Sequence, residues 1–220
     1  MIGKINHRIS EALRQDDLEQ IIGYLLEICE LLIEDCIQKD RKLPNNENRI
    51  RGILLEEYLD NDKVRKAYDM LDYSFMPETL ENYDGEGNYT GRADIRIKLK
   101  TDFDKHSAYY LVECKRIDGD DELNNNYVEK GVARFITQKY SSYYGKNIML
   151  GFVVKKIDIS QNAAEIESIQ NSNADVNMHG SFKLVCKKRN HEMYRCVYRI
   201  KTGELELRHI FSDFADVVVE

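Results

Sequence analysis

Apolar residues recur at helical spacing near the start of the chain. Over residues 16–39, the run DDLEQIIGYLLEICELLIEDCIQK places leucine, isoleucine or cysteine at every third or fourth position, which predicts one long helix with a broad buried face. Pro44 interrupts this pattern, and an asparagine that can cap a helix follows it. A second helix is predicted over residues 47–61, where the carboxylate of Glu47 opens the apolar stripe.

The pattern then changes to that of strands. Residues 63–75 are predicted as a further helix or turn, and residues 81–91, rich in glycine and asparagine, as a loop or hairpin connection. In RADIRIKL, residues 92–99, apolar and charged residues alternate, which is typical of a strand with one buried face. Residues 106–116, HSAYYLVECKR, are more continuously apolar, as expected of a central strand covered on both faces.

Helical and strand patterns continue to the end of the chain. Residues 127–145 have helical spacing, NIMLGFVV at residues 147–154 is another apolar strand, and a short helix and three strand candidates follow. This order predicts an α/β fold with a central mixed β-sheet flanked by helices. We divide the chain into an N-terminal helical extension (residues 1–43), a core (residues 44–157) and a C-terminal helix and strands that complete the same domain (residues 158–220).

The overall charge limits the partners of the protein. Lys and Arg number 32 against 39 Asp and Glu, a net charge of −7, so the chain as a whole is not attracted to nucleic acid or to an anionic membrane. Any nucleic-acid contact must therefore be local. No apolar run approaches the roughly 20 residues of a membrane helix, and the first residues lack the apolar centre of a signal peptide. We expect a cytoplasmic protein without a membrane partner.

Neither the five cysteines nor the five histidines form a recognisable chemical motif. The cysteines are scattered and mostly set in apolar runs, which indicates reduced packing residues rather than a zinc site. The histidines show no HxH or HxxxH spacing and no Ser/His/Asp order, which argues against a histidine-based mechanism. The sequence also lacks a glycine-rich phosphate loop and a dinucleotide fingerprint.

Charged residues occur within the two apolar strands of the core. Glu113 and Lys115 lie two apart in VECKR and so point to the same face of their strand. Asp94, in GRADI, can meet Glu113 at one edge of the sheet, and two carboxylates with waters are the oxygen ligands that Mg²⁺ prefers. Lys115 can orient an attacking water beside them. The alternative is a solvent-exposed ion pair, which a highly charged chain forms often by chance.

Together with Glu47 in NENRI and Gln138 in RFITQKY, these residues resemble the PD-(D/E)XK nuclease superfamily, which has the restriction-endonuclease-like fold. The resemblance implies that Asp94 and Glu113 bind Mg²⁺, with Mn²⁺ as an alternative. It also implies that Lys115 is the catalytic base or positions the water. Glu47 would be an auxiliary acid, and Gln138 a helper near the backbone or the water.

The resemblance covers roughly residues 44–157 and departs from the literal motif at one position. Ala93 precedes the aspartate where the motif has proline. The acid of the first helix is open among Glu47, Glu56 and Glu57. We prefer Glu47 because it shares the apolar stripe of its helix.

The function implied by the resemblance is that of a Mg²⁺-dependent endonuclease hydrolysing nucleic-acid phosphodiester bonds, DNA before RNA, in a restriction or phage-defence setting. The alternative is a non-catalytic module of the same fold that binds protein or nucleic acid. No sequence-reading element is recognisable, so the target stays open. Cleavage of both strands of a duplex would favour a two-fold homodimer, and a partner protein that switches the activity on is the other arrangement left open.

A basic segment lies outside these motifs. Between residues 183 and 201, seven Lys and Arg are accompanied by a single acid, Glu192. Lys187, Lys188 and Arg189 are its densest part, and on paired strands they could contact nucleic-acid phosphates. The alternative is a solvated hairpin.

Overall fold

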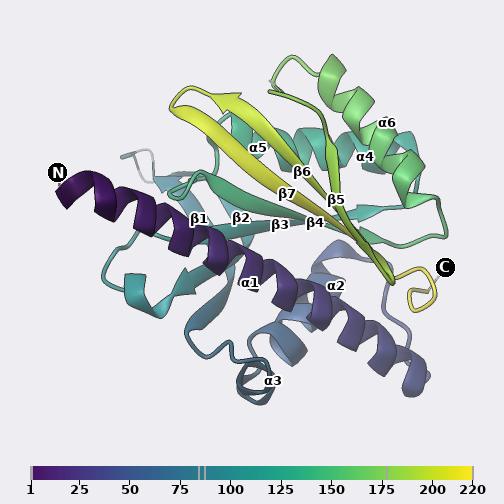
Figure 1. The fold of residues 1–220 in the computed structure, drawn as a ribbon. Helices are drawn as coiled ribbons and strands as arrows, with labels where there is room; N and C mark the ends of the chain where they lie inside the picture. The colour runs from purple at the N-terminus through teal and green to yellow at the C-terminus, as the bar shows by residue number, and fades with distance from the viewer. Residues whose placement is uncertain (1, 84, 87, 177, 220) are drawn as a thin grey trace.

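The computed structural model describes residues 2–83, 85–86, 88–176 and 178–219 (Figure 1). Within these residues, seven strands form one sheet in the order β1-β2-β3-β4-β7-β6-β5. The neighbours β3, β4 and β7 run parallel and the other pairs antiparallel, which confirms the predicted α/β class with a mixed sheet. The strands are β1 (Tyr73–Tyr83), β2 (Tyr89–Leu99), β3 (Tyr110–Ile117), β4 (Lys146–Val153), β5 (Lys183–Lys188), β6 (His191–Ile200) and β7 (Gly203–Asp213).

Helices cover both faces of the sheet (Figure 1). The long helix α1 (Ile2–Gln38) lies across one face with α2 (Glu47–Ile53), whereas α4 (Asp121–Tyr127) and α6 (Ile159–Ser172) cover the other. Helix α2 passes without a break into the π-helical turn η1 (Leu54–Leu59). The remaining short helices are α3 (Asp62–Ala67), η2 (Lys100–Asp102), η3 (Val128–Val132) and α5 (Ala133–Ile136).

Strand β3 is buried on both faces, as predicted. Cys114 belongs to the hydrophobic core beneath α1 and α2. Leu111 and Ile117 belong to the second core, beneath α4 and α6. Because side chains alternate along a strand, Glu113 and Lys115 point to the same face as Leu111 and Ile117. Two charged side chains therefore lie between the apolar residues of the second core.

The expectation for residues 63–91 was wrong in part. Residues 73–83 form strand β1, whereas residues 63–75 were expected to form a helix or turn and residues 81–91 a loop or hairpin connection. Strand β1 pairs with β2 from Tyr73 opposite Leu99 to Tyr83 opposite Tyr89. This pairing extends both strands beyond their apolar parts. The sequence did not predict β1 because hydrogen bonds between strands produce no local pattern of residues.

The helix expected over residues 127–145 was also wrong in its extent. It ends at Ile136, and Gln138 adopts a positive φ of 59°. The ring of Tyr140 is buried, and a Cβ built on Gly91 would lie only 2.8 Å from it. The close approach of this ring to β2 requires the chain to turn back toward the sheet, which ends the helix.

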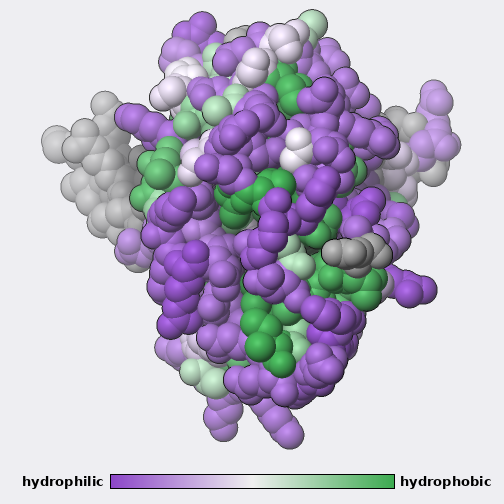
Figure 2. Space-filling view, turned by 90° about the vertical axis from the view of Figure 1, so that its right-hand side faces the viewer, coloured by the Kyte–Doolittle hydropathy of each residue, from purple (hydrophilic) through white to green (hydrophobic). Residues whose placement is uncertain are grey.

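Among the residues described, no helix combines the length and the apolar character needed to cross a membrane. Hydrophilic residues cover most of the face shown in Figure 2, and hydrophobic residues occupy separate areas between them. All five cysteines are free, and Cys29, Cys36, Cys114 and Cys196 are buried, in agreement with their prediction as reduced packing residues.

Candidate functional site

Asp94 lies where the backbone pairing of β2 with β3 ends. The register of the two strands ends at Ile95 opposite Val112. One residue earlier on β2, the Asp94 side chain bonds to β3 in place of the backbone. Its Oδ2 accepts a hydrogen bond from the backbone N–H of Cys114 at 2.7 Å. The carboxylate is therefore held against β3, directly beside Glu113.

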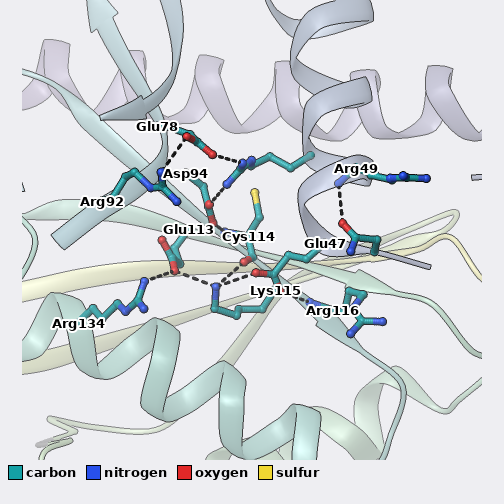
Figure 3. A network of polar contacts seen from close by, with 12 residues as sticks. Glu47, Arg49, Glu78, Arg92, Asp94, Glu113, Cys114, Lys115, Arg116 and Arg134 are labelled. Atoms are coloured by element: carbon teal, nitrogen blue, oxygen red, sulfur yellow. Dashed lines mark hydrogen bonds and ion pairs between the residues drawn. The ribbon is translucent and has the colours of Figure 1, made fainter. Parts of the chain in front are cut away.

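Lys115 is the centre of the polar group drawn in Figure 3. Its Nζ lies 2.9 Å from Glu113 Oε1 and 3.2 Å from Glu47 Oε1. It also donates to the backbone carbonyl of Cys114 at 2.8 Å. The structure thus brings together three of the residues predicted for the site, with the ammonium between two carboxylates.

Glu47 reaches this group because of how α2 begins. It is the first residue of the helix, and the side chain of Asn46 caps the helix by accepting a hydrogen bond from the backbone N–H of Arg49 at 3.1 Å. The second oxygen of Glu47 accepts from the backbone N–H of Arg116 at 3.2 Å. The start of α2 is therefore fastened to the end of β3.

The two alternative acids of this region point elsewhere. Glu56 and Glu57 belong to the π-helical turn that follows α2. Glu57 forms an ion pair with Arg41 at 2.6 Å, and neither acid lines the cavity described below. The geometry therefore agrees with the choice of Glu47.

Glu113 is a nearly inaccessible carboxylate, with 1% of its surface exposed. Burial disfavours the charged form and raises the pKa of Glu113 to about 7, although the cation of Lys115 acts in the opposite direction. Its Oε1 contacts Lys115 and, at 3.3 Å, Arg134. Among the described residues, its Oε2 is the one buried side-chain oxygen without a hydrogen-bond partner.

The ammonium of Lys115 stays charged in this setting. Burial lowers the pKa of Lys115, but the neighbouring carboxylates, led by Glu113 and Glu47, outweigh it and the pKa is raised. The stem of Lys115 runs beside Gly131 of η3, where an added Cβ would lie 3.5 Å from Lys115 Cγ and 2.6 Å from Met149 Cε. A side chain at this position would displace Met149 and crowd the lysine, so glycine lets the helix pack onto β3.

Arg51 was missed in the sequence, although it follows Glu47 by one helical turn. Its guanidinium hydrogen bonds to Asp94 Oδ1 and, at 2.7 Å, to Glu78 Oε1. Glu78 also pairs with Arg92 at 3.1 Å, and its backbone has a positive φ of 42° inside β1, an uncommon conformation for a residue other than glycine. The i, i+4 spacing of Glu47 and Arg51 was the signal available.

Arg134 approaches Glu113 from the side away from Lys115 (Figure 3). Its Nη1 donates to Glu113 and to the hydroxyl of Tyr140 at 2.7 Å, and that hydroxyl donates to the backbone carbonyl of Arg92 at 3.0 Å. The turn that ends α5 thus positions Arg134 at the site.

A cavity of about 540 Å³ opens onto this group. Seven of its lining residues are Lys or Arg and three are acids, so the cavity has an excess of positive charge in a chain of net charge −7. Cations concentrated in a cleft attract an anionic ligand even when the whole protein is acidic. The charged lining residues are Glu47, Arg51, Arg92, Asp94, Glu113, Lys115, Arg116, Lys130, Arg134 and Lys139.

Gln138 is not brought to this group, contrary to the role predicted for it. It lies beyond the end of α5, and its Nε2 donates to Thr202 Oγ1 at 2.8 Å. It lines a separate hollow with Tyr140 and Ile200. The prediction assumed that the helical period continues to residue 138, whereas Arg134 is the residue of α5 that reaches Glu113.

The three cations predicted to contact nucleic acid form ion pairs within the protein. Lys187 pairs with Glu192 at 2.5 Å, and Lys188 with Glu27 of α1 at 2.8 Å. Arg189 lies 3.5 Å from Glu30, also on α1. None of the three lines the cavity. Lys187 pairs across the β5–β6 hairpin, whereas Lys188 and Arg189 join the hairpin to α1. Their contact with nucleic acid stays a prediction.

Carboxylates of the site are candidate ligands for Mg²⁺. The described residues contain no group of three or more His, Cys, Asp or Glu placed to hold a metal ion. Mg²⁺, however, is commonly bound by one or two carboxylates, with waters and substrate phosphates completing the shell. Asp94 and Glu113 supply two carboxylates, and the unpartnered buried Oε2 of Glu113 is an anionic acceptor without a cation, so the donors fit provided that Asp94 exchanges its partner Arg51.

Comparisons of the chain with protein-family models, with curated proteins and with solved structures gave no match.

Proposed function

We propose that this chain is a metal-dependent nuclease with a restriction-endonuclease-like fold, and that it hydrolyses phosphodiester bonds of nucleic acid, DNA before RNA. The observation that carries the proposal is the cavity itself. Asp94, Glu113 and Lys115 meet there with Glu47 from α2, and the surrounding residues carry an excess of positive charge. A polyanion with its reacting phosphate near the carboxylates fits such a cavity.

The placement on the sheet supports the same proposal. Asp94 is on β2, and Glu113 and Lys115 are on the neighbouring strand β3. On its other side, β3 pairs in parallel with β4. A site built on adjacent central strands is held rigidly, because both strands are fixed by their neighbours on the sheet. Rigid placement of the reacting groups is a large part of catalysis in phosphoryl transfer.

Each residue has a separate part in the proposed reaction. The three N–H groups of the Lys115 ammonium donate to Glu113, Glu47 and the carbonyl of Cys114. By exchanging one of these acceptors, the ammonium can donate a hydrogen bond to an attacking water or to a phosphate oxygen. Glu47 keeps that ammonium in place through its 3.2 Å contact. Arg134 and Arg92 can bind phosphate oxygens of the substrate. A divalent metal held by Asp94 and Glu113 would lower the pKa of a water and balance the charge that develops on the phosphate.

The test is cleavage of supercoiled plasmid, single-stranded DNA and RNA with Mg²⁺, with Mn²⁺ and with chelator, beside the Lys115→Ala variant. Cleavage that requires metal and falls by about 10²–10⁴-fold in the variant, the range expected for loss of a catalytic acid or base, would support the proposal. Metal-dependent cleavage that is equal in Lys115→Ala would show that the site lies elsewhere.

A non-catalytic module of the same fold is the second candidate, and the Asp94 contacts favour it. Both carboxylate oxygens of Asp94 already have partners within the protein, Arg51 and the N–H of Cys114. A positively charged cavity without a metal would still bind an anionic segment of nucleic acid or protein. Binding of nucleic acid that is identical with Mg²⁺ and with chelator, and no cleavage under any condition, would establish this candidate.

A further inference from the structure

Arg51 occupies the position at which a metal would approach Asp94. Its guanidinium contacts Oδ1, whereas Oδ2 is bound to the backbone N–H of Cys114 at 2.7 Å. Arg51 and Asp94 are buried, with exposed fractions of 8% and 9%. Removing one member of such a pair without replacement leaves an uncompensated buried charge, so a metal can reach Asp94 Oδ1 only by taking over the role of the guanidinium.

Arg51 has a second partner that can retain it. The other arm of the guanidinium lies 2.7 Å from Glu78 Oε1, and the Glu78 side chain is 41% exposed. Arg51 also lines the cavity. If the Arg51 side chain rotates away from Asp94 and keeps its contact with Glu78, the guanidinium stays paired and faces the cavity. A guanidinium in this position can donate two parallel hydrogen bonds to a phosphate.

We propose that Arg51 and the divalent metal compete for Asp94, and that metal binding releases Arg51 to bind a phosphate of the nucleic acid. This inference rests on the proposed function, because the metal and the polyanion are the ligands named there. Arg51 is then a positioning residue for the metal site and a binding residue for the substrate. The protein without substrate keeps its metal site neutralised by its own arginine.

A reciprocal coupling follows from this exchange. Nucleic acid that binds Arg51 removes the competitor of the metal, and metal that binds Asp94 frees the arginine for nucleic acid. Each ligand therefore raises the affinity for the other by the same factor. The expected coupling is about tenfold, in the lower part of the range of 5–150-fold that is typical of linked sites.

The first experiment measures metal binding without nucleic acid. Mn²⁺ is titrated calorimetrically into the wild type, Arg51→Met and Arg92→Met. Arg92 is a matched control because it also lines the cavity and pairs with Glu78 but does not contact Asp94 in the structure. Arg51→Met is expected to bind Mn²⁺ at least tenfold more tightly than the wild type, whereas Arg92→Met, which loses the same charge, changes the affinity by less than threefold.

The second experiment measures the coupling without catalysis. In Lys115→Ala protein, Mn²⁺ is expected to raise the affinity for a fluorescent DNA oligonucleotide about tenfold, and adding Arg51→Met to this variant should reduce that factor to below twofold. If Arg51→Met does not fold, as judged by circular dichroism, Arg51→Lys replaces it. Lysine is too short to span Asp94 and Glu78, and we expect at least threefold tighter Mn²⁺ binding.

The possible results separate the two proposals. Wild type that binds metal and cuts nucleic acid, with Arg51→Met or Arg51→Lys binding Mn²⁺ no more tightly, would overturn the competition and leave the nuclease intact. An equal gain in Arg51→Met and Arg92→Met would also overturn it, because the effect would then be one of net charge. Absence of metal binding and of cutting in every variant would overturn the proposed function, and this inference with it.

Discussion

Two buried polar side chains, Glu113 and His209, lie in the same row of the sheet but differ in their hydrogen bonding. Glu113 on β3 pairs with Met149 on β4, which in turn pairs with His209 on β7. Two strand spacings separate them, about 10 Å, and both face the core beneath α4 and α6. Their exposed fractions are 1% and 0%, so burial alone does not distinguish them.

The imidazole of His209 has a partner at each nitrogen. The hydroxyl of Tyr198 lies 2.5 Å from Gln170 Oε1, to which it donates, so it accepts from His209 Nε2–H at 3.0 Å. The other nitrogen, Nδ1, then accepts from the hydroxyl of Tyr127 at 2.9 Å. Burial lowers the pKa of His209 to about 3, so the ring stays neutral and its hydrogen bonds serve packing.

Glu113 is left incomplete in an equally buried place. One of its oxygens has two cationic partners, the other has none, and the side chain borders a cavity lined by further cations. An unsatisfied buried polar atom costs about 1–3 kcal/mol, and such costs are characteristic of binding sites. Of these two equally buried groups, the one with an unpartnered atom is the one that borders the cavity.

The largest expected effect is the loss of cleavage in Glu113→Gln. The amide removes a negative charge from the proposed metal site, and we expect cleavage to fall about 10³-fold or more, because the metal contributes several kcal/mol to the reaction. His209→Leu is the matched control from the same row and should retain the wild-type rate per folded molecule. Plasmid cleavage at pH 8 measures both, and equal losses in the two variants would contradict the comparison.

The next effect concerns the stability of the protein in acid. Since the folded pKa of His209, about 3, lies below its unfolded value of 6.5, stability from the neutral ring is present above pH 6.5 and lost as the pH falls toward 3. Between pH 7 and pH 4 this loss amounts to about 3 kcal/mol.

His209→Leu removes the titration, but it leaves the Tyr127 hydroxyl without its partner and takes from Tyr198 one of its two partners. We expect this to cost about 2 kcal/mol at pH 7. The free energy of unfolding from urea titrations should therefore favour the wild type at pH 7 and the variant at pH 4. A constant difference between the two proteins over this range would show that the pKa of His209 is the same in the folded and unfolded states, against the lowered pKa expected from burial.

The smallest expected effect has the opposite sign and belongs to Glu113. Its folded pKa of about 7 lies above the ordinary value of 4.5, so its contribution to stability is present below pH 4.5 and lost as the pH rises through 7. At pH 8, with chelator, Glu113→Gln should be more stable than the wild type by roughly 2–3 kcal/mol. Thermal unfolding at pH 5 and pH 8 tests this, and a variant less stable at pH 8 would show that Lys115 and Arg134 stabilise the carboxylate fully.

The sequence by itself determined the class of the fold and the placement of the charged side chains on β2 and β3. Periodicity predicted the long first helix and the apolar central strand, because burial of one helix face or of a whole strand imposes a regular spacing of apolar residues. The E-x-K spacing placed Glu113 and Lys115 on one face, since side chains two apart on a strand must point the same way. Asp94 could be added because its strand alternates so regularly.

Only the tertiary structure decided which distant residues complete the site. Arg51 lies seven positions after Pro44 and 43 positions before Asp94. The pairing of Arg51 with Asp94 depends on how α2 packs against the end of β3. Gln138 lost its predicted place because the burial of Tyr140 against Gly91 ends the preceding helix. The sequence also did not predict strand β1 or the ion pair of Lys188 with Glu27 of α1, because both depend on contacts between distant segments. Contacts between segments far apart in the sequence are set by packing and strand register, which local spacing does not encode.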